Sequence, residues 1–457
     1  MNKFNQLYIP AFCLPYPSAP SIKQGRTEQN RIELKRNTMM FARVSKTGSS
    51  ILCHHNQQLQ LPAQRWLSTS RLQTLRNQLA MDTSMDPVNH FLNKTTKTKS
   101  SFSLDDIYNQ LPPIPSQQEQ LKQQQQLLTD THNRHHTYLR LSVSERCNLR
   151  CQYCMPPEGV PLSPKSNLLS TDELLHIAQV FVTHGVTKIR LTGGEPMVRP
   201  DIVDLVRGLS TKHIGMTTNG LTLVRQLEPL MEAGLSHVNI SLDTLQHDRF
   251  IEITRRPGLE KVLKAIELAA TQTHLKVKIN CVVMNGFNDD ELMEFVTTFT
   301  PMGVDVRFIE WMPFHDNGWN RERFVSYKTM VDTLQQQLPG LRSLVPSDPN
   351  DTTKWWSTTR EEDSATSATG RVGFITSMSE HFCGSCNRLR ITADGQLKVC
   401  LFGSSEVSLR DALRRGLSLE PLIHYAIQKK HAVLGGHGTA EGIVKANDNR
   451  PMTLIGG

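Results

Sequence analysis

Residues 138–156, YLRLSVSERCNLRCQYCMP, decide the fold, because an extended apolar segment runs directly into three closely spaced cysteines. Cys147, Cys151 and Cys154 form the pattern Cys-x-x-x-Cys-x-x-Cys within a single loop. An electron-transfer [4Fe–4S] cluster takes four cysteines, whereas three thiolates leave one iron with an open coordination position. The stretch therefore predicts a strand followed by a cluster loop that performs chemistry on a bound molecule.

A structural zinc site is the alternative, because closely spaced cysteines are common zinc ligands. Zinc fingers, however, pair two short Cys or His units, whereas these three cysteines share one loop. The spacing, placed after a first strand, resembles the radical SAM superfamily, in which S-adenosylmethionine binds the open iron. We therefore favour an iron–sulfur cluster over zinc.

Downstream of this loop, short apolar runs alternate with helical patterns. One helical stretch opens with the capping box Ser170–Glu173, and another spans residues 260–270. The strand-like runs are residues 139–143, 188–191, 214–217, 237–242, 277–284 and 306–311. Six strand–helix units in series predict a parallel α/β sheet, whereas a complete TIM barrel has eight. The expected fold is an α/β partial (β/α)6 TIM-type barrel with its functional loops at the carboxyl ends of the strands.

Composition divides the chain into three expected regions. Residues 1–137 are rich in Gln, Ser, Asn and Pro and hold too little apolar content for a core. We expect a targeting segment and a disordered Gln-rich linker there, a partial barrel at 138–345, and a C-terminal cluster-binding region at 346–457. Within the last region, the polar segment 347–369 predicts a surface loop or linker.

The N-terminal region also has the composition of a mitochondrial presequence. Leu34 to Met81 contains no Asp or Glu but carries seven Lys or Arg residues. An Arg-rich, Ser-containing, acid-free stretch is typical of a transit peptide. We therefore expect the mitochondrial matrix as the location, and a merely disordered basic extension is the alternative.

Charge, hydropathy and cysteine usage argue against a nucleic-acid-binding protein, a membrane-spanning protein and a small secreted domain. The net charge of +8 comes without the Lys/Arg block of a nucleic-acid-binding tail. No segment approaches the roughly 18 uninterrupted apolar residues of a membrane span. The nine cysteines divide into two triplets plus Cys13, Cys53 and Cys281, which is not the even framework of a small secreted domain. We expect no nucleic-acid partner and no membrane span.

A second cysteine triplet consists of Cys383, Cys386 and Cys400. Zinc with His381 as a fourth ligand is one interpretation, and a second cluster with an open iron is the other. Arg388 follows close behind, and in a strand Arg390 projects to the same side as Arg388. Paired guanidinium groups grip phosphate well, so this neighbourhood favours a site for an anionic substrate.

Three stretches together closely resemble the GTP 3′,8-cyclase family of molybdenum cofactor biosynthesis. They are residues 140–156, the run Arg-Leu-Thr-Gly-Gly-Glu-Pro at 190–196, and residues 383–395 with Cys400. The resemblance extends from about Tyr138 to Gly457, roughly 70% of the chain. Two cysteine triplets combined with an Arg-x-Arg pair are far more specific than any single motif.

The resemblance implies two [4Fe–4S] clusters and S-adenosylmethionine as cofactors. The first triplet would ligate the cluster that cleaves S-adenosylmethionine, and Cys383, Cys386 and Cys400 would ligate a second cluster that anchors guanine. The positions that match the family's S-adenosylmethionine contacts are Tyr153, Gly194, Ser241 and Met312. Gly194 also has a physical role, because glycine lets the backbone approach the methionyl group closely, although a tight turn alone would explain it.

The same resemblance implies a GTP site and a functional C-terminal tail. The positions that match the family's GTP contacts are Arg140, Arg190, Thr217, Lys278, Arg388, Leu389 and Arg390. Five converging cations suit a triphosphate. Gly456 and Gly457 would reach the active site and complete a catalytic set with the N-terminal cysteines, Arg388 and Arg390. A frayed terminus is the alternative for the two glycines.

The implied reaction is the conversion of GTP to 3′,8-cyclo-7,8-dihydro-GTP by a radical SAM lyase. The implied partners are an electron donor, a cyclic pyranopterin monophosphate synthase that takes the product onward, and a second copy of the chain in a homodimer. Two alternatives stay open. A radical SAM peptide-modifying enzyme would need no triphosphate cradle, and a non-catalytic iron–sulfur or zinc scaffold would form no 5′-deoxyadenosine.

Overall fold

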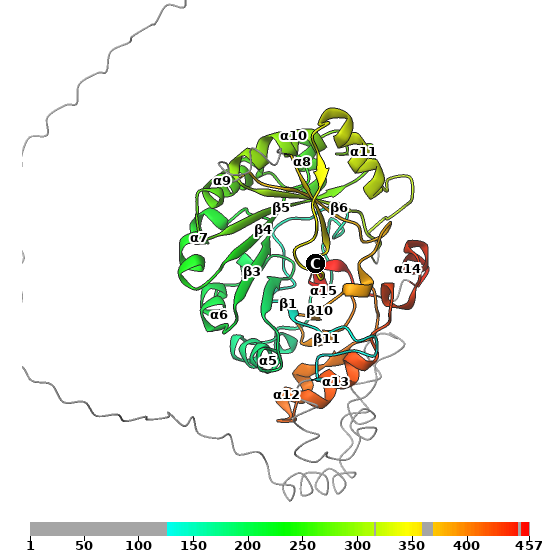
Figure 1. The fold of residues 1–457 in the computed structure, drawn as a ribbon. Coiled ribbons are helices and arrows are strands. Elements are labelled where there is room, and N and C mark those ends of the chain that lie inside the picture. The colour runs from blue at the N-terminus through cyan, green and yellow to red at the C-terminus, as the bar shows by residue number, and fades with distance from the viewer. Residues whose placement is uncertain (1–125, 315–316, 359–368, 447–448, 457) are drawn as a thin grey trace, which may run out of the picture. The chain divides into compact units, whose positions relative to one another are not determined.

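A 12-stranded sheet organises the part of the chain that the computed structural model describes, namely residues 126–314, 317–358, 369–446 and 449–456 (Figure 1). The targeting segment and most of the Gln-rich linker expected within residues 1–137 lie outside these ranges, as does Gly457. The strand order is β12-β11-β10-β1-β2-β3-β4-β5-β6-β9-β8-β7.

Six consecutive parallel strands confirm the expected partial barrel. They are β1 (Tyr138–Ser142), β2 (Lys188–Thr192), β3 (His213–Thr218), β4 (His237–Ser241), β5 (Lys276–Val283) and β6 (Asp305–Glu310). The helices between and after them are α5 (Thr171–Thr183), α6 (Ile202–Gly208), α7 (Leu223–Glu232), α8 (His247–Thr254), α9 (Leu259–Ala270), α10 (Leu292–Phe299) and α11 (Tyr327–Gln337). The capping box at Ser170–Glu173 is formed as predicted. The helices lie on the outer side of the curved sheet (Figure 1).

The C-terminal region extends the same sheet at both edges. Strand β10 (Arg388–Ile391) pairs in parallel with β1, and β9 (Val372–Ile375) pairs in parallel with β6. The antiparallel strands are β7 (Arg342–Ser343), β8 (Thr353–Ser357), β11 (Gln396–Lys398) and β12 (Val407–Ser408). Strands from both expected regions, 138–345 and 346–457, therefore share one sheet.

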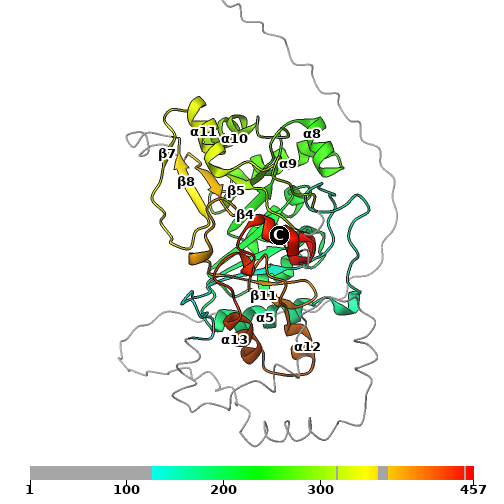
Figure 2. The same ribbon diagram turned by 90° about the vertical axis from the view of Figure 1, so that its right-hand side faces the viewer.

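Four helices and a short tail complete this region. They are α12 (Leu409–Arg414), α13 (Glu420–Gln428), α14 (Ala440–Ala446) and α15 (Met452–Ile455). Helix α12 lies beside α5, where Arg414 forms an ion pair with Glu173 (Figure 2). Short 3-10 turns include Pro196–Val198 and Cys383–Ser385.

Two expectations about the borders of the fold were wrong. The segment 347–369 contains strand β8, whose Trp355 is buried, so it is not only a loop. Residues 126–137, which we call the N-terminal strap, also belong to the folded part, because Leu128 and His136 are fully buried. The strap escaped notice because its apolar residues are too few and too irregular to show a period.

Alternation along the strands positions the site. Parallel strands with both faces buried usually carry near-continuous apolar runs, but here most alternate residues of these strands are polar. Outward-facing residues such as Leu139, Ile189 and Leu389 are fully buried in the hydrophobic core under the helices. The opposite, inward face therefore carries the polar and charged side chains of β1–β6 and β10.

Candidate active site

Three arginines form a row across the inward face of the sheet. The strand register aligns Arg390 on β10 with Arg140 on β1, and Arg140 with Arg190 on β2. The next position in the row is Gly215 on β3, where an added Cβ would lie 3.1 Å from the Arg190 guanidinium. Glycine at this position gives the Arg190 side chain room to extend over the sheet.

The row is a region of strong positive potential. Burial lowers the pKa of Arg140 to about 10, with Arg190 adding to the shift and Tyr138 opposing it. Burial, Arg140 and Arg388 lower the pKa of Arg390 further. Tyr138 accepts a hydrogen bond from Arg190 Nε at 2.5 Å, and although burial raises its pKa, Arg190, Arg140 and Lys188 lower it to about 7. The cations thus stabilise negative charge at this place.

Lys278 and Arg307 bring two further cations to the inward face from β5 and β6. Burial and Arg307 lower the pKa of Lys278 to about 7, against the opposing effect of Asp305 at 3.7 Å. Burial, with Arg190 adding to the effect, lowers the pKa of Arg307 to about 10. Sequence analysis missed Arg307, although it has an inward position within a predicted strand, as Arg140 and Arg190 do.

Several buried polar atoms on this face have no hydrogen-bond partner within the described residues. They are Nε and one terminal nitrogen of Arg388, Nε of Arg307, Oγ1 of Thr217 and Oδ1 of Asn239. Buried polar groups are normally hydrogen-bonded. Unpaired guanidinium nitrogens and a hydroxyl on one concave face are what a polar, anionic ligand would satisfy.

Among the predicted GTP contacts, Leu389 has a side chain that does not lie on the inward face. Its side chain points to the opposite face of β10 from Arg388 and Arg390 and is fully buried in the core. Only its backbone can therefore face the ligand.

The first cysteine triplet lies in the loop after β1, as predicted. Burial, and then the neighbouring thiols and Asp243, raise the pKa of Cys151 and Cys154. Cys147 Sγ accepts hydrogen bonds from neutral donors, the Leu149 backbone N–H at 3.4 Å and the Asn219 amide at 3.9 Å.

Tyr153 connects this loop to the end of β4. Its hydroxyl donates to Asp243 at 2.7 Å, and the other Asp243 oxygen accepts from the Val282 backbone. Ser241 lies two residues before Asp243, at the carboxyl end of β4. Two of the predicted S-adenosylmethionine positions, Tyr153 and Ser241, are therefore held at the same end of the barrel.

The glycine turn after β2 packs directly against the cluster loop. An added Cβ at Gly194 would lie 2.4 Å from the Arg146 carbonyl oxygen, and at Gly193 2.3 Å from that of Ser144. The Gly194 N–H donates to Ser144, and the Glu195 N–H donates to Arg146. Contact with the loop preceding Cys147 thus requires glycine here, whether or not a ligand approaches.

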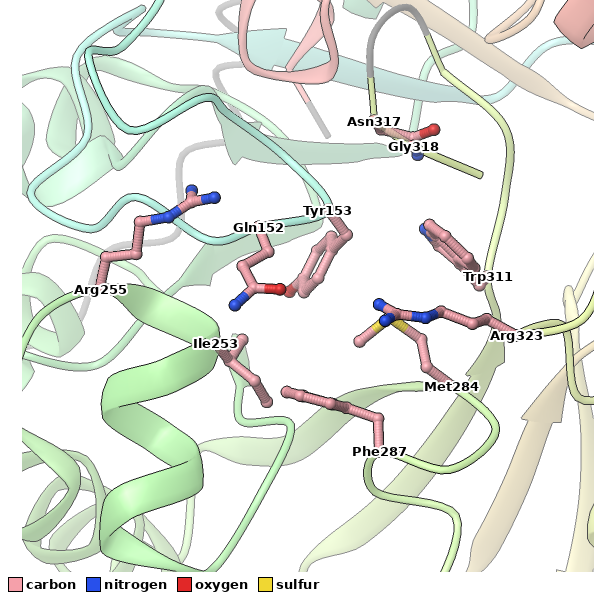
Figure 3. Close-up of a pocket in the computed structure, with 10 residues that line it drawn as sticks. All are labelled: Gln152, Tyr153, Ile253, Arg255, Met284, Phe287, Trp311, Asn317, Gly318 and Arg323. Carbon is pink, nitrogen blue, oxygen red and sulfur yellow. The ribbon is translucent and has the colours of Figure 1, made fainter. Parts of the chain in front are cut away.

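A cavity of about 200 Å³ opens beside the cluster loop at the ends of β5 and β6 (Figure 3). Tyr153, Met284 and Trp311 line it, together with Arg255 and Arg323. The Trp311 Nε1 is buried and has no partner in the described ranges. Of the predicted S-adenosylmethionine positions, only Tyr153 lines this cavity, while Gly194, Ser241 and Met312 lie outside it.

The second triplet lies at the opposite end of the barrel, before β10. Burial and the other two thiols raise the pKa of Cys383. Cys386 is different: burial raises its pKa, but Arg388 and Lys430 lower it to about 6. His381 is exposed and takes no part in these shifts, so nothing here adds to the zinc interpretation.

Met312, the last predicted S-adenosylmethionine position, joins this region to β6. It packs with Cys383 and Cys400 against a small apolar cluster of Phe402, Leu434 and Ile443. Its carbonyl accepts from the Asn317 amide at 2.9 Å.

The C-terminal tail reaches the row of arginines. Arg390 donates to the Gly456 carbonyl oxygen at 3.0 Å, and Thr192 donates to it at 3.3 Å. Gly456 has φ +80°, and an added Cβ would lie 2.7 Å from Ser142 Cβ. The tail is anchored upstream by Arg450, which pairs with Asp394 at 3.0 Å.

Both triplets fit an iron–sulfur cluster by donor chemistry, since each supplies three free thiols. In the described ranges, no three His, Cys, Asp or Glu side chains converge as ligands of one metal ion do. Among those same residues, no helix is long and apolar enough to cross a bilayer.

A partial barrel with a three-cysteine loop after its first strand defines the class of protein as radical SAM. The model of the Radical SAM superfamily matches residues 141–299, and that of Molybdenum Cofactor Synthesis C matches residues 304–434. Among curated relatives, "GTP 3′,8-cyclase, mitochondrial" of Arabidopsis thaliana is 47% identical over 72% of this chain and 84% of its own length. "GTP 3′,8-cyclase" of Peptoclostridium acidaminophilum is 41% identical over 66% of this chain and 92% of its own. The chain belongs to the GTP 3′,8-cyclase family of radical SAM proteins.

Another relative is longer than this chain. "Molybdenum cofactor biosynthesis protein 1" of Bos taurus is 53% identical over 335 residues, which are 72% of this chain and 51% of the relative. The chain thus spans about half the length of this relative. The comparisons confirm the family resemblance drawn from the two triplets and the Arg-x-Arg pair.

Proposed function

We propose that the chain converts GTP to 3′,8-cyclo-7,8-dihydroguanosine 5′-triphosphate, the first step of molybdenum cofactor biosynthesis. The observation that carries this proposal is the set of unpaired buried donors of Arg307, Arg388 and Thr217 on the inward face. They lie between one cysteine triplet at each end of the barrel. A polyanionic nucleotide would supply the missing acceptors.

The cationic face would bind and orient the nucleotide. Arg140, Arg190 and Arg390 form one row, so their planar guanidinium groups can each share phosphate or base oxygens through two hydrogen bonds. Lys278 and Arg307 add charge from the other side of the barrel. Because these cations lower one another's pKa in the free protein, an anion between them relieves their repulsion.

The cofactors in this proposal are two [4Fe–4S] clusters and S-adenosylmethionine. Cys147, Cys151 and Cys154 would hold one cluster, and Cys383, Cys386 and Cys400 the other. When bound, the first cluster and S-adenosylmethionine supply a 5′-deoxyadenosyl radical that can remove the 3′ hydrogen of GTP. Gly194 shapes the turn beside the first cluster, and the buried barrel interior excludes water from the reacting atoms.

The tail has a positioning role in this proposal. The Gly456 carbonyl oxygen orients the Arg390 guanidinium through its hydrogen bond, and Thr192 holds that carbonyl from β2. Because Gly456 fills a space in which a Cβ would collide with Ser142, the backbone itself would border the substrate.

The proposal extends to location and partners. The Arg-rich, acid-free segment before Met81 supports a mitochondrial matrix location, and the Arabidopsis relative carries "mitochondrial" in its name. An electron donor would reduce the first cluster, and a cyclic pyranopterin monophosphate synthase would consume the product. A homodimer completes the proposed assembly.

The test is anaerobic reconstitution of the full chain with iron and sulfide, followed by mass spectrometry of products from S-adenosylmethionine, dithionite and GTP. We expect 5′-deoxyadenosine and a cyclised GTP isomer in equal amounts. Formation of 5′-deoxyadenosine without GTP conversion would support a radical SAM enzyme but contradict GTP as its substrate. That result is expected for a peptide-modifying enzyme. No 5′-deoxyadenosine at all would favour the non-catalytic scaffold.

A further inference from the structure

Lys430 is a buried ammonium group beside the second cysteine triplet. It follows α13 and is 3% exposed. Its Nζ lies 3.5 Å from Cys386 Sγ, 3.1 Å from the Arg388 carbonyl oxygen and 2.8 Å from His136 Nε2. Sequence analysis gave no indication of this residue, because it lies outside both cysteine motifs.

This ammonium group has no carboxylate as a partner in the described part of the chain. Its other contacts are backbone carbonyls and an imidazole, all of them neutral. A buried charge is costly unless an opposite charge compensates it. The Cys386 sulfur is the contact that can carry a negative charge, so Lys430 is suited to a site where Cys386 is a thiolate.

The N-terminal strap holds Lys430 in place. The Leu128 carbonyl accepts a hydrogen bond from His136 Nδ1 at 2.8 Å, which leaves Nε2 of the neutral ring to accept from Lys430. Arg134, paired with Asp130 at 2.6 Å, donates to the carbonyls of both Cys383 and Ala432 at 2.9 Å. The strap thus fastens the cysteine loop to the segment that carries Lys430.

We propose that Lys430 is the fixed counter-charge of the C-terminal cluster and raises its reduction potential through a hydrogen bond to the ligating Cys386 sulfur, with His136 as its positioning residue. The inference rests on the proposed second cluster. Hydrogen bonds to the sulfurs and nearby charge set cluster potentials, and a cation favours the reduced, more negative state. Among the described residues, the hydrogen bonds to Cys147 Sγ come from neutral donors, the Leu149 backbone and the Asn219 amide, so a hydrogen bond from a cation distinguishes the second cluster.

The experiment uses the full chain with Cys147→Ser, Cys151→Ser and Cys154→Ser as parent, so that only the C-terminal cluster binds. Its midpoint potential is measured by a redox titration followed by electron paramagnetic resonance, with iron per chain and circular dichroism recorded in parallel. We expect Lys430→Met to lower the potential by at least about 59 mV, a tenfold weaker preference for the reduced state. Lys430→Gln, which keeps an N–H donor without charge, should give a smaller shift, and His136→Gln a smaller one still.

Lys429→Met is the matched control, because Lys429 is the exposed neighbour in the same turn and should leave the potential unchanged. An unchanged potential in Lys430→Met at full iron content would overturn the inference and leave the second cluster intact. If Lys430→Met does not retain iron, unchanged potentials in both Lys430→Gln and His136→Gln would overturn it. A parent protein without iron would overturn the second cluster itself, and the inference with it.

Discussion

The two cysteine triplets each supply three thiols, but their spacings and their electrostatic surroundings differ. Around the first, burial and the carboxylate of Asp243 raise the pKa of Cys151 and Cys154. Around the second, Arg388 and Lys430 overcome the effect of burial and lower the pKa of Cys386 to about 6. A carboxylate therefore lies near two thiols of the first triplet, whereas two cations lie near Cys386 of the second.

This difference favours separate tasks for the two triplets, which the presence of three cysteines in each does not by itself distinguish. Cluster ligands must lose their protons, and a nearby cation stabilises the resulting thiolate. At the second triplet, the same Arg388 that stabilises Cys386 also directs unpaired nitrogens to the inward face. In the proposed function, these cations place the anionic substrate beside the second triplet, whereas the first triplet lies beside the loops proposed for S-adenosylmethionine.

The largest expected effect comes from removing one thiol at each end. Cys147→Ser should abolish 5′-deoxyadenosine formation, because the first cluster loses a ligand, while iron at the second triplet stays. Cys386→Ser should show the reverse, with 5′-deoxyadenosine still formed and GTP no longer converted. Both are measured by chromatography of 5′-deoxyadenosine and by iron content. Cys281→Ser is the control, since Cys281 is a buried thiol outside both triplets.

Two outcomes of these experiments would contradict separate tasks for the two triplets. Substantial 5′-deoxyadenosine from Cys147→Ser would remove the assignment of the first cluster. Equal loss of S-adenosylmethionine cleavage in both variants, at full retention of the other cluster's iron, would show that the two ends do not act separately.

The next effect concerns the cations between the triplets. Arg307→Met should weaken GTP binding about tenfold to a hundredfold, because a hydrogen bond to a charged group contributes about 1.5–3 kcal/mol. S-adenosylmethionine cleavage without GTP should persist. Equilibrium dialysis with labelled GTP measures the affinity, and Arg207→Met on the exposed face of α6 is the control.

The stability of Arg307→Met shows whether weaker GTP binding results from a lost ligand contact or from a destabilised fold. Arg307 is buried, its Nε has no partner among the described residues, and one terminal nitrogen donates to the Asn280 amide oxygen. Its removal should therefore lower the free energy of unfolding of the GTP-free protein by no more than that one hydrogen bond, about 1.5 kcal/mol. A large loss of stability in a denaturant titration would mean that Arg307 supports the fold instead of the ligand.

Much of this arrangement could be predicted from the sequence. The six strands follow from apolar runs between helical patterns, and Arg140 and Arg190 attract attention because they interrupt such runs. Strand β10 was not predicted to pair with β1, and that pairing is what places Arg390 beside Arg140. Local patterns fix the direction in which a side chain points, but the neighbour of a strand depends on contacts far apart in sequence.

Residues that act through distant contacts were missed for the same reason. Lys430 and His136 lie 294 positions apart in sequence, and neither belongs to a motif. Leu389 was included as a GTP contact because it stands between two arginines, yet strand alternation turns its side chain into the core. The electrostatic difference between the triplets thus has a local part, Arg388 beside Cys386, and a distant part, Lys430, that the cysteine spacing does not reveal.

A smaller effect is expected at the tail, where the Gly456 carbonyl oxygen accepts from Arg390 and Thr192. Gly456→Ala should slow GTP conversion about tenfold, because the new Cβ would collide with Ser142 and strain of about 1–3 kcal/mol accompanies an unfavourable backbone. Release of 5′-deoxyadenosine should continue, so that it exceeds the cyclised product. Gly438→Ala is a matched control, with φ +76° but nothing within 4 Å of the added Cβ. Full GTP conversion in Gly456→Ala, or after deletion of Gly456 and Gly457, would remove the tail from the site.

The smallest effect is a fraction of a proton taken up when GTP binds. Burial and Arg307 hold the pKa of Lys278 at about 7, so at pH 8 this amine is largely neutral. A triphosphate beside it favours the charged form and raises its pKa, so binding takes up protons and GTP affinity falls as pH rises above about 7. Calorimetry of GTP binding in two buffers of different ionisation enthalpy measures this uptake.

Two variants separate Lys278 from the other group that titrates in the same range. Lys278→Met should reduce the uptake, whereas Lys276→Met, on the same strand but exposed, should not. Tyr138, whose pKa is about 7, would also take up a proton next to a triphosphate, so Tyr138→Phe removes that share. Proton release, or an uptake that Lys278→Met leaves unchanged, would mean that the triphosphate does not lie beside Lys278. The anion would then be held only by the arginines near the second triplet, and the cationic face would serve one end of the barrel instead of joining both.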